Sequence, residues 1–188
     1  MATSLLLISA ASTASARAGG FSYADEPLDD RGARDAAAFR LPPRFSGNIH
    51  CSPWLNARQT AAALGEAKRE DAIADADPGV WSGLAFDRIE ADDPGALLAW
   101  LADPAAGAPG GESIAAAQLR IGRWLDGMAK AEGAACAFTH PMMIRAALAH
   151  AIGISVKATL AIDIAPLSCA LLSFNRMWRL QALGTVGG

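Results

Sequence analysis

Apolar positions in this chain follow two patterns. Short continuous apolar runs are typical of buried strands, and apolar residues three and four positions apart are typical of helices. The runs predict a strand with its following turn at 4–13 and further strands at 47–51, 134–139, 168–174 and 177–183. The helical spacing predicts helices at 30–39, 52–68, 84–89, 94–101, 113–132 and 142–152.

The segments between these elements are predicted from their small and polar residues. Residues 14–23 and 103–111 are rich in Ala, Gly, Ser or Pro, which favours loops. Segment 72–83 is mixed and indicates a short strand followed by a turn. Asn175 and Arg176 separate the last two strands and predict a hairpin.

Strands that alternate with helices indicate an α/β fold. With the terminal hairpin added, we expect a three-layer α/β/α sandwich with a mixed, mostly parallel central sheet. The chain has no internal repeat and no linker composition. Residues 1–188 are therefore predicted to form a single domain.

Composition and charge narrow the class of protein. Hydrophobic residues make up 52% and charged residues 19%, which is typical of a globular chain. A net charge of −3 provides no basic field for nucleic acid. No apolar run approaches the roughly 18 residues of a membrane span, so neither nucleic acid nor membrane is an expected partner.

The N-terminus and the cysteines bear on the cell compartment. Leu5 to Ala11 could be read as a secretory signal, but nothing basic precedes Arg17, which favours a strand. The three cysteines form no CxxC pair and lie in or beside predicted strands, where small buried hydrophobes are common. A reducing cytoplasm is the expected location.

The turn after the first strand is the expected ligand site, because open α/β sheets bind ligands at the carboxyl ends of their strands. Five short motifs elsewhere in the chain add to this. They are Asp-Glu-Pro-Leu at 25–28 with Gly32, Ser-Pro-x-x-x-Ala-Arg-Gln-Thr-Ala at 52–61, Gly-x-Trp-x-Gly at 79–83, Pro-Gly-Gly-Glu-Ser at 109–113 and Thr-His-Pro-x-x-Ile-Arg-Ala at 139–146. In this order and spacing, they resemble motifs of the histidine phosphatase (phosphoglycerate mutase-like) superfamily.

The resemblance implies a phosphoglycerate mutase-like fold and a particular chemistry. In that family, a histidine at the end of the first strand attacks a phosphoryl group, and two arginines and a second histidine surround the phosphate. An acidic residue protonates the leaving oxygen. Imidazole is a nucleophile near neutral pH, and guanidinium groups match phosphoryl oxygens in pairs. No metal or other cofactor is implied.

Aligned with the family's motifs, this chain departs from them at the centre of the site. Ser9 corresponds to the first arginine, Ala10 to the nucleophilic histidine and Asn56 to the second arginine. Glu112 remains at the acid position and His140 at the position of the second histidine. Arg58 belongs to a motif position outside the phosphate shell, which favours a role on the helix surface. It is also a candidate for binding in the altered phosphate pocket, in place of a missing arginine.

These departures argue against the family's reaction. Alanine cannot be phosphorylated, and each lost charge-assisted contact removes about 1.5–3 kcal/mol. We therefore expect a degenerate member that is inactive in phosphoryl transfer and acts as a binding or regulatory module for a small molecule or a protein partner. The alternative is a phosphomonoester hydrolase (phosphatase) that uses His140 and Glu112 in altered roles. A third reading is a homodimer or partner subunit whose function lies on its surface.

Individual residues keep alternatives of their own. His140 is a nucleophile, a ligand-binding group or simply a hydrogen-bonded histidine. Glu112 is an acid or a helix cap. Ser9 and Ser12 offer hydroxyl nucleophiles, but the chain has no G-x-S-x-G elbow to support them. The pocket left by the small residues is either open or filled by its neighbours.

Overall fold

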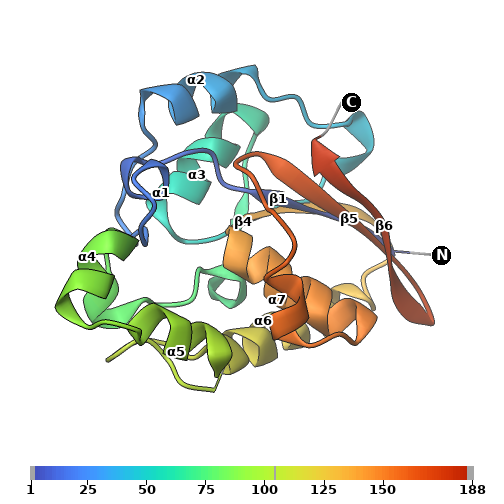
Figure 1. Ribbon diagram of the computed structural model, residues 1–188. Helices are drawn as coiled ribbons and strands as arrows, with labels where there is room; N and C mark the ends of the chain where they lie inside the picture. Colours follow the sequence, from blue (N-terminus) through green and yellow to red (C-terminus); the bar gives the residue numbers. More distant parts are fainter. Residues whose placement is uncertain (1–2, 104, 186–188) are drawn as a thin grey trace.

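The computed structural model describes residues 3–103 and 105–185 and has a six-stranded sheet at its centre. The strand order is β3-β2-β4-β1-β5-β6 (Figure 1). The strands are β1 (Thr3–Ser9), β2 (Ile49–Cys51), β3 (Lys68–Arg69), β4 (Gly133–Thr139), β5 (Ser168–Asn175) and β6 (Met177–Thr185). β3, β2, β4 and β1 run parallel to one another. β5 pairs antiparallel with β1 on one side and with β6 on the other. This confirms the predicted mixed sheet and the terminal hairpin.

Strand β1 lies between β4 and β5 and forms the middle of the sheet. Side chains alternate between the two faces of a strand. Leu5 and Leu7 pack on one face in a large core cluster, while Leu6 and Ile8 pack on the other in a second cluster. Both faces of β1 are buried, which explains why its sequence is a continuous apolar run.

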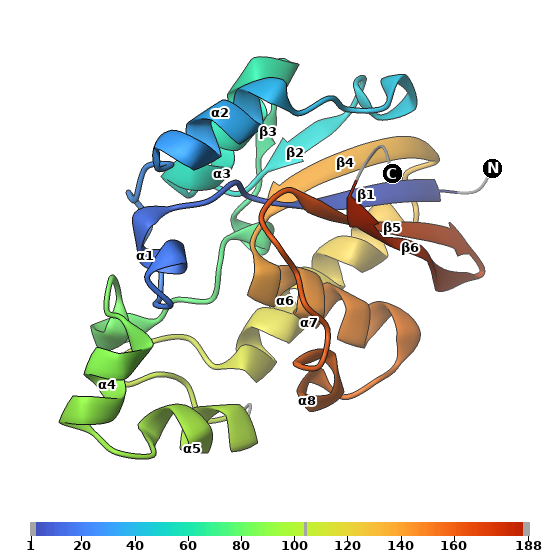
Figure 2. The same ribbon diagram turned by 45° about the horizontal axis from the view of Figure 1, so that its top comes forward.

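Helices cover both faces of the sheet and complete the predicted three layers (Figure 2). α2 (Asp30–Ala38) and α3 (Leu55–Ala61) lie on one side. α6 (Ile114–Met128) and α7 (Pro141–Ile152) lie on the other and pack against each other. Buried residues of α6 and α7 join the cluster that contains Leu5 and Leu7.

A smaller aromatic unit lies away from the sheet. It contains α4 (Phe86–Asp92) and α5 (Ala96–Ala102), which flank a cluster of Trp81, Ile89 and Ala108 with Phe21 and Trp100 packed against it. Figure 2 shows these two helices on the side of α1 (Ala14–Arg17). The unit therefore forms one wall of the region beyond the carboxyl ends of the parallel strands.

Several boundaries differ from the sequence prediction. The predicted strand in 72–83 is wrong: this part holds the 3-10 turns Asp71–Ile73 and Gly79–Trp81. The helix predicted at 52–68 is only Leu55–Ala61, followed by the 3-10 turn Ala62–Leu64 and a left-handed Gly65. The helix predicted at 113–132 ends at Met128.

Three further short elements complete the described chain. They are the helix α8 (Val156–Thr159), the 3-10 turn Pro43–Phe45 and α1, which lies within the predicted loop 14–23. Helices of four residues have too few apolar positions for a periodic pattern to reveal them. All three cysteines are buried, as predicted. Across the described ranges, no helix is long and apolar enough to cross a membrane.

Candidate functional site

The ends of β1 and β4 bring Ala10 and His140 to the same edge of the sheet. Ser9 pairs with Thr139 across the parallel strands, and the Ala10 amide donates a hydrogen bond of 2.8 Å to the Thr139 carbonyl. Ser9 is completely buried and Ala10 is 7% exposed. The position predicted for the family's nucleophile is therefore a small, closely packed side chain.

Helix α3 is fastened to this edge through Asn56 and Thr60. The Ala11 amide donates to the Thr60 hydroxyl at 3.0 Å, and that hydroxyl donates to the Asn56 carbonyl at 2.7 Å. Asn56 is 2% exposed, and its side-chain oxygen accepts no hydrogen bond from the described residues. Asn56 thus lies buried beside the end of β1.

Arg58, two residues further along α3, lies near a different part of the sheet. Burial raises the pKa of the Cys51 thiol to about 12, and the positive charge of Arg58 opposes this shift. Arg58 does not line the cavity of about 610 Å³ described below. Its predicted association with an altered phosphate pocket stays a prediction.

His140 is buried and held in one orientation. Its Nε2 lies 2.7 Å from the Ser52 hydroxyl, which already accepts a hydrogen bond from the Trp54 amide. The Ser52 proton is thereby free to go to Nε2, which favours the tautomer that carries its proton on Nδ1. Burial, with a further contribution from the charge of Arg120, lowers the pKa of His140 to about 3, so the ring is neutral at pH 7.

Ser52 is not the cap residue of α3. Serine is favoured as a helix cap, because its side-chain oxygen accepts a hydrogen bond from one of the first free amides, and the helix predicted at 52–68 begins with it. The Ser52 hydroxyl instead contacts His140, and α3 begins at Leu55, with Trp54 as its cap residue.

Asp75 is the acidic residue closest to His140, and the motifs did not point to it. One of its carboxyl oxygens lies 3.7 Å from His140 Nδ1, and its side chain is 21% exposed. Burial raises the pKa of Asp75 to about 7, although the Ala76 amide and the charge of Arg120 oppose the shift. A carboxyl group with this pKa can hold a proton near neutral pH and deliver it to a substrate.

Glu112 and Arg120 hold the segment that carries Asp75. The Arg120 guanidinium contacts both Glu112 carboxylate oxygens, at 3.0 and 2.6 Å. The same guanidinium donates to the carbonyls of Asp71 and Ala74 at 2.9 and 3.0 Å. Thr139 adds a hydrogen bond of 2.6 Å to the Ile73 carbonyl.

The alternative roles of Glu112 can be compared with this geometry. Ser113, not Glu112, caps α6, since its hydroxyl accepts from the Ala116 amide at 3.1 Å. The Glu112 carboxylate is engaged by Arg120. The capping alternative is therefore not realised, and a direct role of Glu112 as an acid stays a prediction.

Two of the predicted motifs meet next to Asp75. Gly79 and Gly111 lie so close to the backbone of the opposite loop that a Cβ atom on either would collide with it. The Glu112 amide donates to the Asp77 carbonyl at 2.8 Å, and the Val80 amide donates to the Pro109 carbonyl at 3.0 Å. The glycines are needed because only a residue without a side chain permits this approach.

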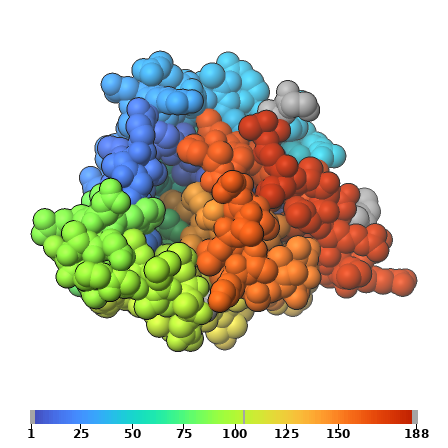
Figure 3. Space-filling view, viewed as in Figure 1, coloured from blue at the N-terminus to red at the C-terminus, as the bar shows by residue number. Residues whose placement is uncertain are grey.

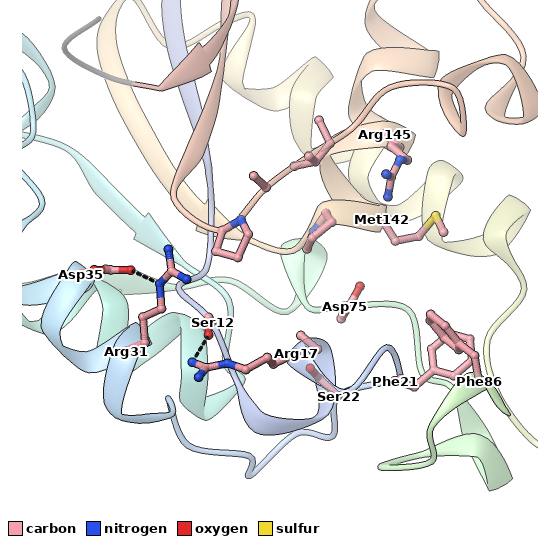
Figure 4. Close-up of a pocket in the computed structure, with 16 residues that line it drawn as sticks. Ser12, Arg17, Phe21, Ser22, Arg31, Asp35, Asp75, Phe86, Met142 and Arg145 are labelled. Carbon is pink, nitrogen blue, oxygen red and sulfur yellow. Dashed lines mark hydrogen bonds and ion pairs between the residues drawn. The ribbon is translucent and has the colours of Figure 1, made fainter. Parts of the chain in front are cut away.

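A cavity of about 610 Å³ opens at this edge of the sheet (Figure 4). Its lining carries the guanidiniums of Arg17, Arg31 and Arg145 and the carboxyl groups of Asp35 and Asp75. The other lining residues are small, hydroxylic or apolar: Ser12, Ala16, Gly20, Phe21, Ser22, Phe86, Pro141, Met142, Ile164, Ala165 and Pro166. Positive charges outnumber negative ones, which suits an anionic ligand.

Of the residues predicted from the strand-end motif, only Ser12 lines this cavity; Ser9, Ala10, Asn56 and His140 do not. Asp75 also lines a second cavity of about 390 Å³, together with Glu112 and Arg120. Asp75 thus connects the predicted acid to the arginine-lined cavity. Its place four residues before Gly79 is the one sequence signal that could have identified it.

In the part of the chain that the structure describes, no three His, Cys, Asp or Glu side chains come together in a way that could hold a metal ion.

A cavity large enough for a small molecule at the carboxyl ends of parallel strands, with arginines on its wall, is the ligand-site arrangement of open α/β proteins. Comparison with known families is more specific. The profile of the histidine phosphatase superfamily (branch 1) matches residues 6–184. The chain belongs to this family, as the motifs predicted.

Solved structures share the fold over nearly their whole length. The mycobacterial glucosyl-3-phosphoglycerate phosphatase is 24% identical with a TM-score of 0.84, and the alignment covers 98% of this chain and 100% of that one. A protein described as mycobacterial hydrolase 1 is 24% identical with a TM-score of 0.86, over 98% and 99% of the two chains. A comparison with curated proteins gives no match.

A third similar structure is a phosphoserine phosphatase from Entamoeba histolytica, solved as a histidine-to-alanine mutant in complex with phosphoserine. It is 19% identical with a TM-score of 0.85, and the alignment covers 98% of each chain. That structure contains both an alanine substitution and a bound phosphomonoester.

These comparisons correct the expectation of an inactive binding or regulatory module. The chain belongs to a phosphatase superfamily, and solved structures that share its fold include two phosphatases. Phosphomonoester hydrolysis, the alternative reading, is therefore better supported. The correspondence of Ser9, Ala10 and Asn56 to the family's catalytic positions stays a prediction.

Proposed function

We propose that this chain is a phosphomonoester hydrolase in which Asp75 protonates the leaving alcohol. The observation that carries the proposal is the position of Asp75, which lines the arginine-bearing cavity and lies 3.7 Å from the buried His140. Membership of the histidine phosphatase superfamily supports the same reaction class.

The phosphate is bound by the arginines on the cavity wall. Arg17 is 55% exposed and is oriented by Asp29 at 2.6 Å and by the Ser12 hydroxyl at 3.2 Å. Arg31 is 71% exposed and contacts Asp35 at 3.4 Å. Guanidinium groups can form paired, charge-assisted hydrogen bonds with phosphoryl oxygens, and these side chains keep donors for that purpose.

The nucleophile in this proposal is a water molecule, because Ala10 has no group that could accept the phosphoryl. Water forms a bond to phosphorus while the bond to the alcohol oxygen breaks, and the Asp75 proton moves to that oxygen. The attacking water releases a proton with the phosphate product, which returns one to Asp75. A loose phosphoryl transition state needs little help from a base, so positioning and charge carry the catalysis.

His140 acts as a positioning residue for Asp75. A neutral ring with its proton on Nδ1 faces the carboxyl group and stabilises the carboxylate that forms when the proton has left. Ser52 fixes the ring from the other side. Glu112 acts on Asp75 indirectly. It orients Arg120, and Arg120 holds the backbone of 71–75.

The test is phosphate release from an alkyl phosphomonoester, for which leaving-group protonation matters most. Asp75→Asn is expected to lower kcat by about 10²–10⁴-fold, the range of general acid catalysis. Asp93→Asn, on an exposed residue at the end of α4, is the matched control. Failure of the purified parent to release phosphate would overturn the proposal, as would equal rates for the parent and Asp75→Asn.

A pH profile provides a second readout. Asp75 must be protonated to act as an acid, and burial raises its pKa to about 7. Activity is therefore expected to fall as the pH rises through about 7. A rate that rises through the same range would exclude Asp75 as the acid.

A further inference from the structure

We propose that the preferred substrates are phosphomonoesters with an aromatic or similarly apolar organic group. This inference rests on the proposed phosphatase activity and adds the substrate class. It is carried by the distribution of side chains along the 610 Å³ cavity, which is polar at one end and apolar at the other.

The polar end is formed by Ser12, Arg17 and Arg31, which come from the turn after β1, from α1 and from α2. In Figure 4, these three side chains lie together on one side of the cavity. The side chains of Arg17 and Arg31 are more than half exposed, so a phosphate can reach both guanidiniums without displacing buried side chains. The phosphate group belongs at this end.

The apolar end is formed by Phe21, Phe86 and Met142. Figure 4 shows these side chains on the opposite side from Arg17 and Arg31, with Asp75 between the two groups. A phosphomonoester laid along the cavity places its bridging oxygen near Asp75 and its organic group against the two phenylalanines. This orientation is the one that lets Asp75 protonate the leaving oxygen.

The phenylalanine wall is held in place before any ligand binds. The Phe21 ring stacks on Trp81 at 5.8 Å and meets the edge of Trp100 at 5.4 Å. Phe86 packs edge-on against Phe21 at 5.1 Å and remains 40% exposed. A preformed apolar surface binds an apolar group at little cost in conformational entropy.

The polar side chain labelled nearest to Met142, Arg145, is already partly engaged by the protein. The Arg145 guanidinium donates twice to the Ile162 carbonyl, at 3.1 and 2.8 Å. A sugar or glycerol group would lose water contacts here and gain few in return, which disfavours polyhydroxylated substrates.

The experiment compares benzyl phosphate with glycerol 1-phosphate. Both have a primary alcohol as the leaving group, so the comparison isolates the organic group. The expected kcat/KM for benzyl phosphate is at least about tenfold higher, the discrimination that a few apolar carbons provide in a fitted pocket. Binding of each compound is measured by calorimetry on the same protein.

A variant connects the preference to the wall. Phe86→Ala is expected to reduce the benzyl-to-glycerol ratio toward 1. Leu98→Ala is the control, since Leu98 is 70% exposed on α5 and does not line the cavity. A thermal melt establishes that both variants fold.

The outcomes separate this inference from the proposed function. Turnover of both compounds at equal kcat/KM, or a preference for glycerol 1-phosphate, would overturn the substrate class and leave the phosphatase proposal standing. Absence of turnover with tighter binding of benzyl phosphate would overturn the phosphatase and retain the apolar wall. A benzyl preference that survives Phe86→Ala would show that the wall described here is not its source.

Discussion

Two parts of the same sheet edge differ sharply in charge and packing. At the end of β1, Ser9, Ala10 and Asn56 are neutral and at most 7% exposed. A short distance along the chain, Arg17 and Arg31 line the 610 Å³ cavity, and their charged side chains are more than half exposed. The site's positive charge therefore lies on the helices that follow β1, not at the strand end itself.

This difference shows where arginine side chains can be accommodated at the edge of the sheet. A guanidinium buried at the strand end would need partners for its charge, because desolvation of an ion without compensation is costly. Small neutral residues pack there without that requirement. Partly exposed arginines keep their hydration until a phosphate replaces it, so the cavity can be charged while the core beneath it is neutral.

The largest effect is expected from moving charge back to the strand end. The triple variant Ser9→Arg, Ala10→His and Asn56→Arg places three larger groups in a buried region, where overpacking costs about 1–3 kcal/mol per position. We expect a clear fall in the free energy of unfolding, measured by urea denaturation.

The same triple variant tests the nucleophile. If it folds, an alkaline quench with labelled substrate is expected to trap a phosphohistidine that the parent does not form, because the N–P bond is stable in base and hydrolysed in acid. A trapped phosphoenzyme in the parent would refute attack by water.

The next largest effect concerns the cavity arginines. Arg17→Ala and Arg31→Ala each remove charge-assisted contacts worth about 1.5–3 kcal/mol. That corresponds to a rise of roughly 10- to 150-fold in the inhibition constant of inorganic phosphate. Arg88→Ala, on an exposed residue paired with Asp92 on α4, is the control and should leave inhibition unchanged. Unchanged inhibition in both cavity variants would locate the phosphate elsewhere.

A smaller effect is expected at Arg120, which acts through the loop that carries Asp75. Arg120→Met removes the hydrogen bonds to the Asp71 and Ala74 carbonyls. It is expected to lower kcat by about tenfold with little change in KM, because misplacement of a catalytic group affects the chemical step. Arg120→Lys should recover part of kcat. Loss of KM alone would contradict a positioning role.

The smallest effect is on the pH dependence of stability, where the two neighbours act in opposite directions. The pKa of His140 is lowered to about 3, so its contribution to stability is lost as the pH falls from 6.5 toward 3. The pKa of Asp75 is raised to about 7, so the unfolded chain releases this proton first and stability falls as the pH rises from about 4 to 7.

Single variants separate these two trends. Asp75→Asn should remove the Asp75 trend, so that only the His140 trend remains and the free energy of unfolding rises more steeply with pH between about 4 and 6.5. His140→Gln should leave only the Asp75 trend, so that the free energy of unfolding falls as the pH rises over the same range. Thermal melts across this range provide the measurement, and two variants with the same slope as the parent would refute the assignment.

Local patterns were enough to predict most of the framework. The apolar run from Leu5 to Ile8 required burial on both faces, and that placed β1 at the centre of the sheet. Asp29 was well suited to a helix start, and its carboxylate accepts the Gly32 amide at 2.7 Å. Five motifs in order were sufficient for the family. Each of these features depends on neighbours close in sequence or on an ordered set of short segments.

Tertiary structure alone decided the candidate site. Ser52 looked like a helix cap from its local sequence, yet its hydroxyl contacts His140, 88 residues away. Asp75 gains its raised pKa from burial, and Arg120 reaches its segment from 46 to 49 residues further along the chain. The chain's sequence determines which groups are present and which elements carry them. Their protonation, orientation and access to a ligand depend on segments that meet only in the folded chain, because burial and long-range hydrogen bonds have no signature in a local pattern.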